Sequence, residues 1–200
     1  MPRLTPQSIA NGAPGTRLGR RCVFALWGLL LILAPGWAGA DERVSERELR
    51  AVYLYNFSAF ITWPDSAFAS GEGDFRYCVL GNRALGKLLA GVLEGESVQG
   101  RGLRLVDATQ PAQWRQCQLL YVDPDMSDMA SSVLRAVEGL PVLTVTGSRE
   151  VMDQGFMTAL VRQGRRVKPV VHRQRVQAAG IRISSKLLRL SILVGDGEPD

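Results

Sequence analysis

Residues 75–93 read FRYCVLGNRALGKLLAGVL, and this stretch decides the class of the fold. Residues 75–80 form a short apolar run that predicts a strand, and residues 84–93 have the apolar spacing of an amphipathic helix. A strand followed by a helix begins a βαβ unit, in which the next strand returns parallel to the first. The stretch therefore predicts a sheet that is mainly parallel.

The alternation of strand and helix continues downstream. Short apolar runs predict further strands at residues 103–106, 118–122 and 141–146. Helical segments are predicted between these strands, at residues 111–115 and 127–137.

The last third of the chain has a different pattern. Two apolar runs, residues 156–161 and 166–171, flank a polar turn and predict a β-hairpin, which adds an antiparallel edge to the sheet. Residues 174–179 predict a short helix. Residues 181–194 predict a brief strand followed by a basic amphipathic helix.

A helix is predicted before the sheet, at about residues 46–61. Ser45 and Glu48 have the spacing of a capping box, and Trp63-Pro64 ends the segment. Its apolar stripe consists of Leu49, Val52, Tyr53, Phe57 and Phe60. Together the elements predict a compact single α/β domain with a mostly parallel, flavodoxin-like or Rossmann-like sheet, an N-terminal helix and an antiparallel edge hairpin.

Residues 1–40 have the three regions of a signal peptide. Four arginines precede an apolar run at residues 23–33, and Ala38-Gly39-Ala40 resembles a cleavage site. Eleven apolar residues span only about 16 Å as a helix, half of a bilayer core, so cleavage after Ala40 is favoured over an uncleaved tether. Arg20-Arg21 leaves export by the general or the twin-arginine route open. The mature part is then residues 41–200, with a folded core at about 45–194, and it does not span the membrane.

Charge argues against nucleic acid as a partner. Removing residues 1–40 takes four of the 24 Lys and Arg and none of the 19 Asp and Glu, which leaves a net charge of +1. A nucleic-acid-binding domain needs a broad cationic surface. The mature chain offers one local cluster, at Arg162, Arg165, Arg166, Lys168, Arg173 and Arg175.

Two cysteines, Cys78 and Cys117, remain after export, since Cys22 leaves with the leader. In an oxidising compartment a pair is first interpreted as a disulfide. Cys78 lies in the first predicted strand and Cys117 at the start of the third, and these strands are neighbours in a flavodoxin-like order. Two separate buried thiols remain the alternative.

No set of residues in the sequence has the pattern of a catalytic, metal or cofactor site. His172 is the single histidine, and two cysteines with one histidine fall short of a four-ligand metal set. Residues 81–86 lack the spacing of a phosphate-binding loop. The acidic cluster Asp123, Asp125 and Asp128 matches no calcium loop, and turn or N-cap roles for Asp125 and Ser127 are favoured. Ser184 and Ser185 lack the nucleophile motif.

Apolar side chains in or beside loops are a further functional signal. Core burial is the default for each, and two or three grouped on one face would instead indicate a partner surface. The candidates are Trp63, Phe68, Trp114 and Met126.

Five runs in residues 45–194 resemble the YfiR family. They are AVYLYNFSAFITWP at 51–64, YCVLG at 77–81, CQLLYV at 117–122, PVLTV at 141–145 and GIRISSKLLRL at 180–190. The resemblance implies an exported α/β protein without enzymatic activity, and it implies that Cys78 and Cys117 are the family's disulfide pair. Some members have a second cysteine pair that this chain lacks, which puts redox control through such a pair in doubt.

The resemblance also implies a function. The best-studied type is a periplasmic repressor of an inner-membrane diguanylate cyclase, which limits cyclic-di-GMP signalling and biofilm formation. We expect this chain to act as a homodimer and to bind the periplasmic domain of such a cyclase. Arg182, Ser184 and Lys186, facing outward from an edge strand, are the candidate contacts. The alternative is a periplasmic sensor or carrier of a small molecule at the carboxyl ends of the strands.

Overall fold

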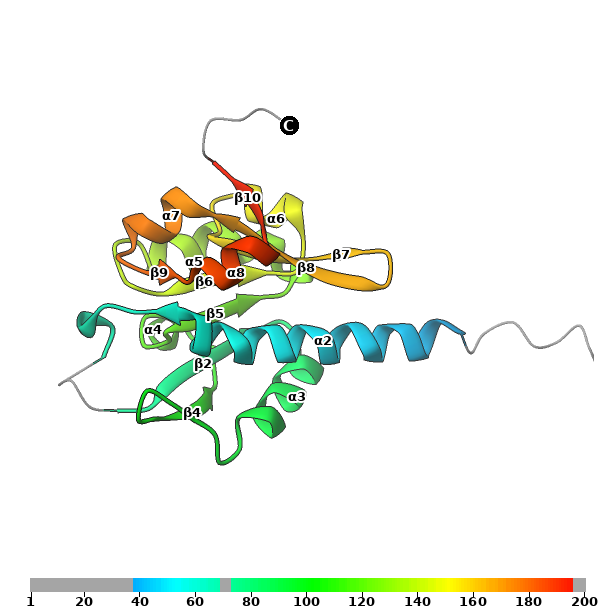
Figure 1. The fold of residues 1–200 in the computed structure, drawn as a ribbon, viewed down its shortest axis with the longest axis horizontal. Coiled ribbons are helices and arrows are strands. Elements are labelled where there is room, and N and C mark those ends of the chain that lie inside the picture. The colour runs from blue at the N-terminus through cyan, green and yellow to red at the C-terminus, as the bar shows by residue number, and fades with distance from the viewer. Residues whose placement is uncertain (1–37, 69–72, 196–200) are drawn as a thin grey trace, which may run out of the picture. The chain divides into compact units, whose positions relative to one another are not determined.

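The computed structural model describes residues 38–68 and 73–195, and residues 41–200 group as one compact unit. Eight strands in the described residues form one sheet in the order β10-β8-β7-β6-β5-β2-β4-β3 (Figure 1). The strands are β2 (Phe75–Leu80), β3 (Ser97–Val98), β4 (Arg101–Val106), β5 (Leu119–Val122), β6 (Leu143–Thr146), β7 (Thr158–Gln163), β8 (Arg166–His172) and β10 (Ile192–Val194). Strands β4, β2, β5, β6 and β7 are parallel, which confirms the predicted sheet.

The predicted hairpin is confirmed as the antiparallel pair β7 and β8, which turns at Gly164 with a φ of 60°. Its predicted place at the edge is wrong, because β10 pairs in parallel with the outer side of β8. The predicted C-terminal helix is correspondingly shorter, since it ends at Leu190 and residues 192–194 are extended. Isoleucine and valine in that last segment favour a strand.

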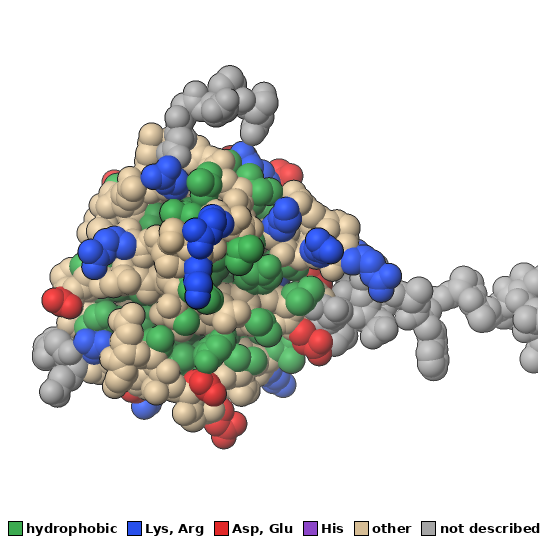
Figure 2. All heavy atoms as spheres, in the orientation of Figure 1, with side chains coloured by type: hydrophobic (Ala, Val, Ile, Leu, Met, Phe, Trp, Pro, Cys, Tyr) green, Lys and Arg blue, Asp and Glu red, His purple; other side chains and the backbone are tan. Residues whose placement is uncertain are grey.

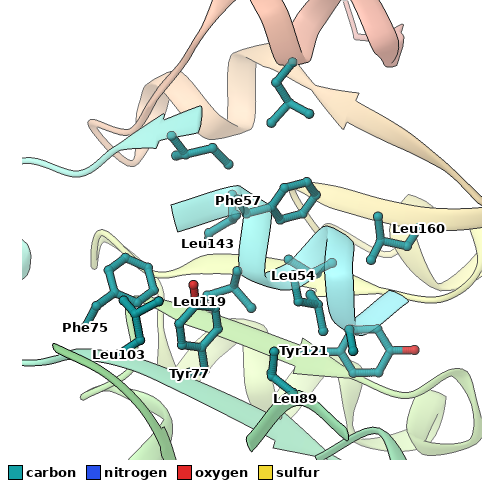
Figure 3. Packing of buried hydrophobic residues seen from close by; sticks show 14 of the residues in the cluster. Leu54, Phe57, Phe75, Tyr77, Leu89, Leu103, Leu119, Tyr121, Leu143 and Leu160 are labelled. Carbon is teal, nitrogen blue, oxygen red and sulfur yellow. The ribbon is translucent and has the colours of Figure 1, made fainter. Parts of the chain in front are cut away.

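Helices cover both faces of the sheet. One face carries α2 (Ala38–Phe60), α3 (Arg83–Leu93), α7 (Arg173–Ala178) and α8 (Ser185–Leu190), and the other carries α4 (Pro111–Trp114), α5 (Ala130–Ala136) and α6 (Arg149–Asp153). Figure 3 shows Leu54 and Phe57 of α2 pointing toward sheet residues such as Leu119 and Leu143. All four of these side chains are fully buried.

Helix α2 differs from the prediction at its start and in its core stripe. It begins at Ala38 and continues through position 45, so the predicted N-cap at Ser45 is wrong. The side chains that it buries are Ala51, Leu54 and Phe57, followed by Ile61. Strand β1 (Ile61–Thr62) then pairs antiparallel with β9 (Arg182–Ile183), which joins the end of α2 to the C-terminal part of the chain.

Polar contacts hold the middle of α2 and the segment that follows it. In the middle of the helix, Arg50 forms an ion pair of 2.7 Å with Glu46, and Glu46 also lies 3.6 Å from Arg162 in the β7–β8 hairpin. Beyond its end, the Trp63 indole donates a hydrogen bond of 3.0 Å to the carbonyl oxygen of Gln118. From about Glu46 onward the helix is therefore held against the sheet.

Within residues 38–68 and 73–195, none of the helices combines the length and the apolar character needed to cross a bilayer. The predicted apolar run at residues 23–33 lies outside the described residues.

Candidate functional site

The crevice that doubly wound sheets use for ligands is closed by side chains here. It lies between the carboxyl ends of β2 and β5. The chain leaves β2 toward β4 on one side and leaves β5 toward β6 on the opposite side. The Asn82 amide donates a hydrogen bond of 2.6 Å to Asp123 across this position. Gly81, with a φ of 85°, packs so closely against Met126 that a Cβ would collide with it.

A cavity of about 650 Å³ lies beside this crevice, at the carboxyl ends of β2 and β4. Arg83, Lys87 and Asp107 line it, and all three are exposed. Asn82 caps α3 by accepting a hydrogen bond of 2.9 Å from the Leu85 amide. The loop at residues 81–86 therefore has a structural role in starting α3, next to a surface with charges of both signs.

The acidic cluster after β5 forms a helix cap. Asp123 accepts a hydrogen bond from the Asp125 amide at 3.2 Å and begins the 3-10 helix Pro124–Met129. The N-cap is thus Asp123. Asp125 and Ser127 lie inside the 3-10 helix, so of their two predicted roles the turn is confirmed and the N-cap is not. Among the described residues, no group of histidine, cysteine, aspartate and glutamate side chains is arranged to hold a metal ion.

His172 caps α7, since its Nδ1 accepts a hydrogen bond of 3.5 Å from the Arg175 amide. It is half-buried at the end of β8. The neighbouring Arg175 guanidinium donates to the carbonyl oxygens of Met152 and Phe156. These contacts connect α7 to the α6–β7 loop, which is a structural use of both side chains.

Cys78 and Cys117 form a disulfide with a Cα–Cα distance of 6.0 Å, a normal separation for this bond. Cys78 lies in β2, and Cys117 immediately precedes β5, which pairs with β2. The neighbouring strand order therefore brings the two cysteines together, although they are 39 residues apart.

The three candidate contact residues do not lie on one edge strand. Arg182 is exposed in β9, but Ser184 caps α8 by accepting a hydrogen bond from the Leu187 amide, and Lys186 is exposed on α8. The predicted outward alternation is therefore wrong beyond Ile183. Serine is a favourable N-cap, so the chain turns into a helix at this point.

Helix α8 separates two hollows that contain two of these candidates. Arg182 lines a hollow of about 250 Å³ together with Arg173 and Ile183. Lys186 lines the second hollow, of about 390 Å³ between α2 and α8. The other residues of the second hollow are Tyr53, Asn56, Phe57, Phe60, Leu187, Arg189 and Leu190.

The second hollow lies within an apolar surface. The large hydrophobic residues that are exposed in the described part of the chain are Leu49 and Val52 of α2, Leu190 of α8 and Leu193 of β10, with 38%, 47%, 69% and 42% of their surface exposed. Ile192 and Val194 pack on the opposite face of the sheet, so Leu193 points toward the side of α2 and α8. Figure 2 shows hydrophobic side chains gathered over the middle of this side, with Lys and Arg side chains across its upper half.

The sequence analysis missed this surface. For its four loop candidates it expected core burial unless two or three grouped on one face. Trp63 and Trp114 are buried in the core, with 8% and 1% of their surface exposed, and Phe68 and Met126 are half-buried. The apolar stripe of Leu49, Val52, Tyr53 and Phe60 is visible in the sequence and could have indicated this surface. Its spacing is the same as that of a stripe that faces a core, so it was interpreted as one. The sheet buries the second stripe of α2, at Ala51, Leu54 and Phe57, and leaves Leu49 and Val52 of the first stripe exposed.

Comparison with known proteins identifies one family. The family described as YfiR/HmsC-like matches residues 47–192. No curated protein matches the sequence. Among solved structures, the chain is similar to an ABC domain from Streptococcus pneumoniae in complex with L-Trp, with 8% identity and a TM-score of 0.52 over 75% of this chain and 60% of that chain. At this identity the likeness concerns the α/β fold alone.

Proposed function

The chain belongs to the YfiR/HmsC-like family, and we propose that it is a periplasmic protein that binds and represses an inner-membrane diguanylate cyclase. It would thereby limit cyclic-di-GMP signalling and biofilm formation. The observation that carries the proposal is the family match over residues 47–192. The exposed apolar surface around α2 and α8 supports a role in binding a protein.

Repression of this kind requires binding and no chemistry. A repressor that prefers the inactive conformation of the cyclase shifts the population by the difference between its two affinities. Moving the cyclase from 99% active to 99% inactive takes a preference of about 5.5 kcal/mol, which a protein interface supplies. We accordingly propose that the chain is not an enzyme and needs no cofactor.

The periplasmic location rests on the leader and the disulfide. Residues 1–40 have the composition of a signal peptide, and the Cys78–Cys117 bond suits an oxidising compartment. N-terminal sequencing of the protein from a periplasmic fraction is expected to begin at Asp41. Sedimentation of this mature protein is expected to give a homodimer.

Deletion of the gene tests the function directly. The cellular cyclic-di-GMP concentration should rise, and the full chain should restore the low level when expressed in the deletion strain. The same chain without residues 1–40 is the control, and it should fail because it stays on the wrong side of the membrane. An unchanged cyclic-di-GMP concentration after deletion would count against repression.

The cavity of about 650 Å³ at the ends of β2 and β4 favours a second candidate function, a periplasmic sensor or carrier of a small molecule. A carrier should yield a bound compound when the mature protein is purified and extracted for mass spectrometry. Retention of that compound, together with unchanged cyclic-di-GMP after deletion, would favour this second function over repression.

A further inference from the structure

Helix α2 has two apolar faces. The fold buries one of them and covers the other only in part, through Tyr53 and Phe60. The outer residues Leu49, Val52, Tyr53, Asn56 and Phe60 recur at the spacing of a helix that buries one side. Leu49 and Val52 are exposed, and Tyr53 and Phe60 are half-buried. This stripe continues across the hollow to Leu190, and these residues together with Lys186 and Arg189 are here called the α2–α8 face.

The extent of the α2–α8 face indicates a macromolecule. Leu49 and Val52 do not line the hollow of about 390 Å³, so a small molecule bound there would leave both exposed to water. From Leu49 to Phe60 the stripe covers twelve residues, and the eleven steps between them span about 16 Å at 1.5 Å per residue. A partner helix of about three turns has this length, and laying an amphipathic helix in a groove is a common mode of recognition.

The charges of the hollow indicate the sign of the partner. Lys186 and Arg189 are the charged residues that line it, both are exposed, and both are cationic. They lie three positions apart on α8 and so share one side of that helix. Carboxylates at the edge of a partner helix would complement them, and such rim charges steer association and fix the orientation.

We propose that the α2–α8 face binds an amphipathic helix of the partner that presents apolar side chains to Val52, Phe60 and Leu190 and carboxylates to Lys186 and Arg189. This rests on the proposed function, because the partner is taken to be the protein that the chain represses. The proposal adds to that function the surface of this chain that binds the partner and the chemistry of the partner segment that binds there.

The first test uses variants in the strain that lacks the gene. Val52→Glu, Leu190→Glu and Arg189→Glu are each expected to lose at least tenfold in the protein concentration needed to restore low cyclic-di-GMP. Arg135→Glu is the matched control, since Arg135 is also an exposed basic residue in the last turn of a short helix, α5, on the opposite face. An unchanged melting temperature for the purified variants would establish that they fold.

The sign of the charge gives a second readout. Replacing Leu190 by lysine should retain more repression than replacing it by glutamate, because lysine suits acidic side chains on the partner. Equal loss from both substitutions would overturn the proposed chemistry. Full repression by all three variants would overturn the assignment of the α2–α8 face as the binding surface. The proposed repressor function would still stand if deletion of the gene raises cyclic-di-GMP.

Three further measurements distinguish the proposed partner helix from other molecules that could occupy the α2–α8 face. A photo-cross-linking residue at position 190 should attach to a segment with apolar residues at helical spacing and neighbouring carboxylates, and attachment to a segment without this pattern contradicts the proposal. Binding to vesicles of phosphatidylethanolamine and phosphatidylglycerol that Arg189→Glu abolishes would indicate a lipid surface instead. Conversion of a dimer to a monomer by Val52→Glu would indicate a second copy of the chain. Either result would overturn the proposal.

Discussion

Arg50 and Gly147 are in contact although 97 residues separate them in the sequence. The Arg50 guanidinium donates a hydrogen bond of 3.1 Å to the Gly147 carbonyl oxygen, and a Cβ at Gly147 would lie 3.0 Å from the guanidinium carbon. The same Cβ would be 2.7 Å from the Tyr121 hydroxyl. Glycine at position 147 therefore makes room for the side chain that joins α2 to the loop after β6.

Gly147→Ala is expected to lower the free energy of unfolding by about 2 kcal/mol, because the hydrogen bond from the charged Arg50 is displaced. Urea unfolding of the purified protein measures this. Gly91→Ala is the control, since Gly91 lies within α3 with open space around its Cα. There the change should stabilise by about 1 kcal/mol through helix propensity. Equal effects at the two positions would contradict the packing described at Gly147.

Gln118 connects the start of β2 to the segment after α2. Its side chain accepts a hydrogen bond of 2.8 Å from the Arg76 amide and donates one of 2.6 Å to the Ala67 carbonyl oxygen. Gln118→Ala leaves both backbone groups without this partner, and should lower the free energy of unfolding by about 3 kcal/mol. The nearby exposed Gln116 provides the control, since Gln116→Ala should change the free energy of unfolding by less than about 0.5 kcal/mol. Thermal unfolding of both variants would reveal the difference, and a small effect at both would argue against the contacts.

The disulfide should contribute a large share of the stability of the domain. Replacing both Cys78 and Cys117 with alanine is expected to reduce the free energy of unfolding by roughly 4 kcal/mol, because the bond closes a loop of about 40 residues in the unfolded chain. Under denaturing conditions, the mature protein should give no free thiol with Ellman's reagent. Two reactive thiols per chain would show that the bond does not form.

Tyr121 should make the domain sensitive to alkaline pH. Burial raises the pKa of its hydroxyl above the ordinary value of 10.0, with the nearby Arg50 opposing the shift. As pH rises above about 10, the unfolded chain releases this proton first, so the free energy of unfolding falls. Tyr121→Phe should reduce that fall, while the pH dependence below about pH 9 stays the same. Urea midpoints across this range test the sign, and an unchanged alkaline slope in the variant would contradict it.

Local patterns were sufficient to predict most strands and the class of the fold. The run at residues 75–80 coincides with β2, because a short apolar segment ended by Gly81 has few other ways to bury its side chains. The start of α2 was predicted wrongly, since a capping-box spacing also occurs inside helices. Strand β10 was missed because its three residues were read as the end of a helix, and its pairing with β8 is a tertiary contact.

The candidate site was harder to predict than the fold. The sequence identified the segment that contains Arg182, Ser184 and Lys186. It did not indicate that Arg182 in β9 and Lys186 in α8 line separate hollows. It also contained both apolar stripes of α2 without indicating which one the sheet covers. A one-dimensional pattern gives the spacing of apolar residues, and burial depends on which element packs against them.

By itself the sequence determined the alternation of strands and helices, the near-neutral charge of residues 41–200 and the presence of two cysteines in that part. Tertiary structure alone decided that Ala51, Leu54 and Phe57 face the core while Leu49 and Val52 remain exposed. The reason is geometric: a helix with apolar residues on two sides can present only one of them to a single sheet. Which side remains open depends on contacts such as that between Arg50 and Gly147, which join residues far apart in the chain.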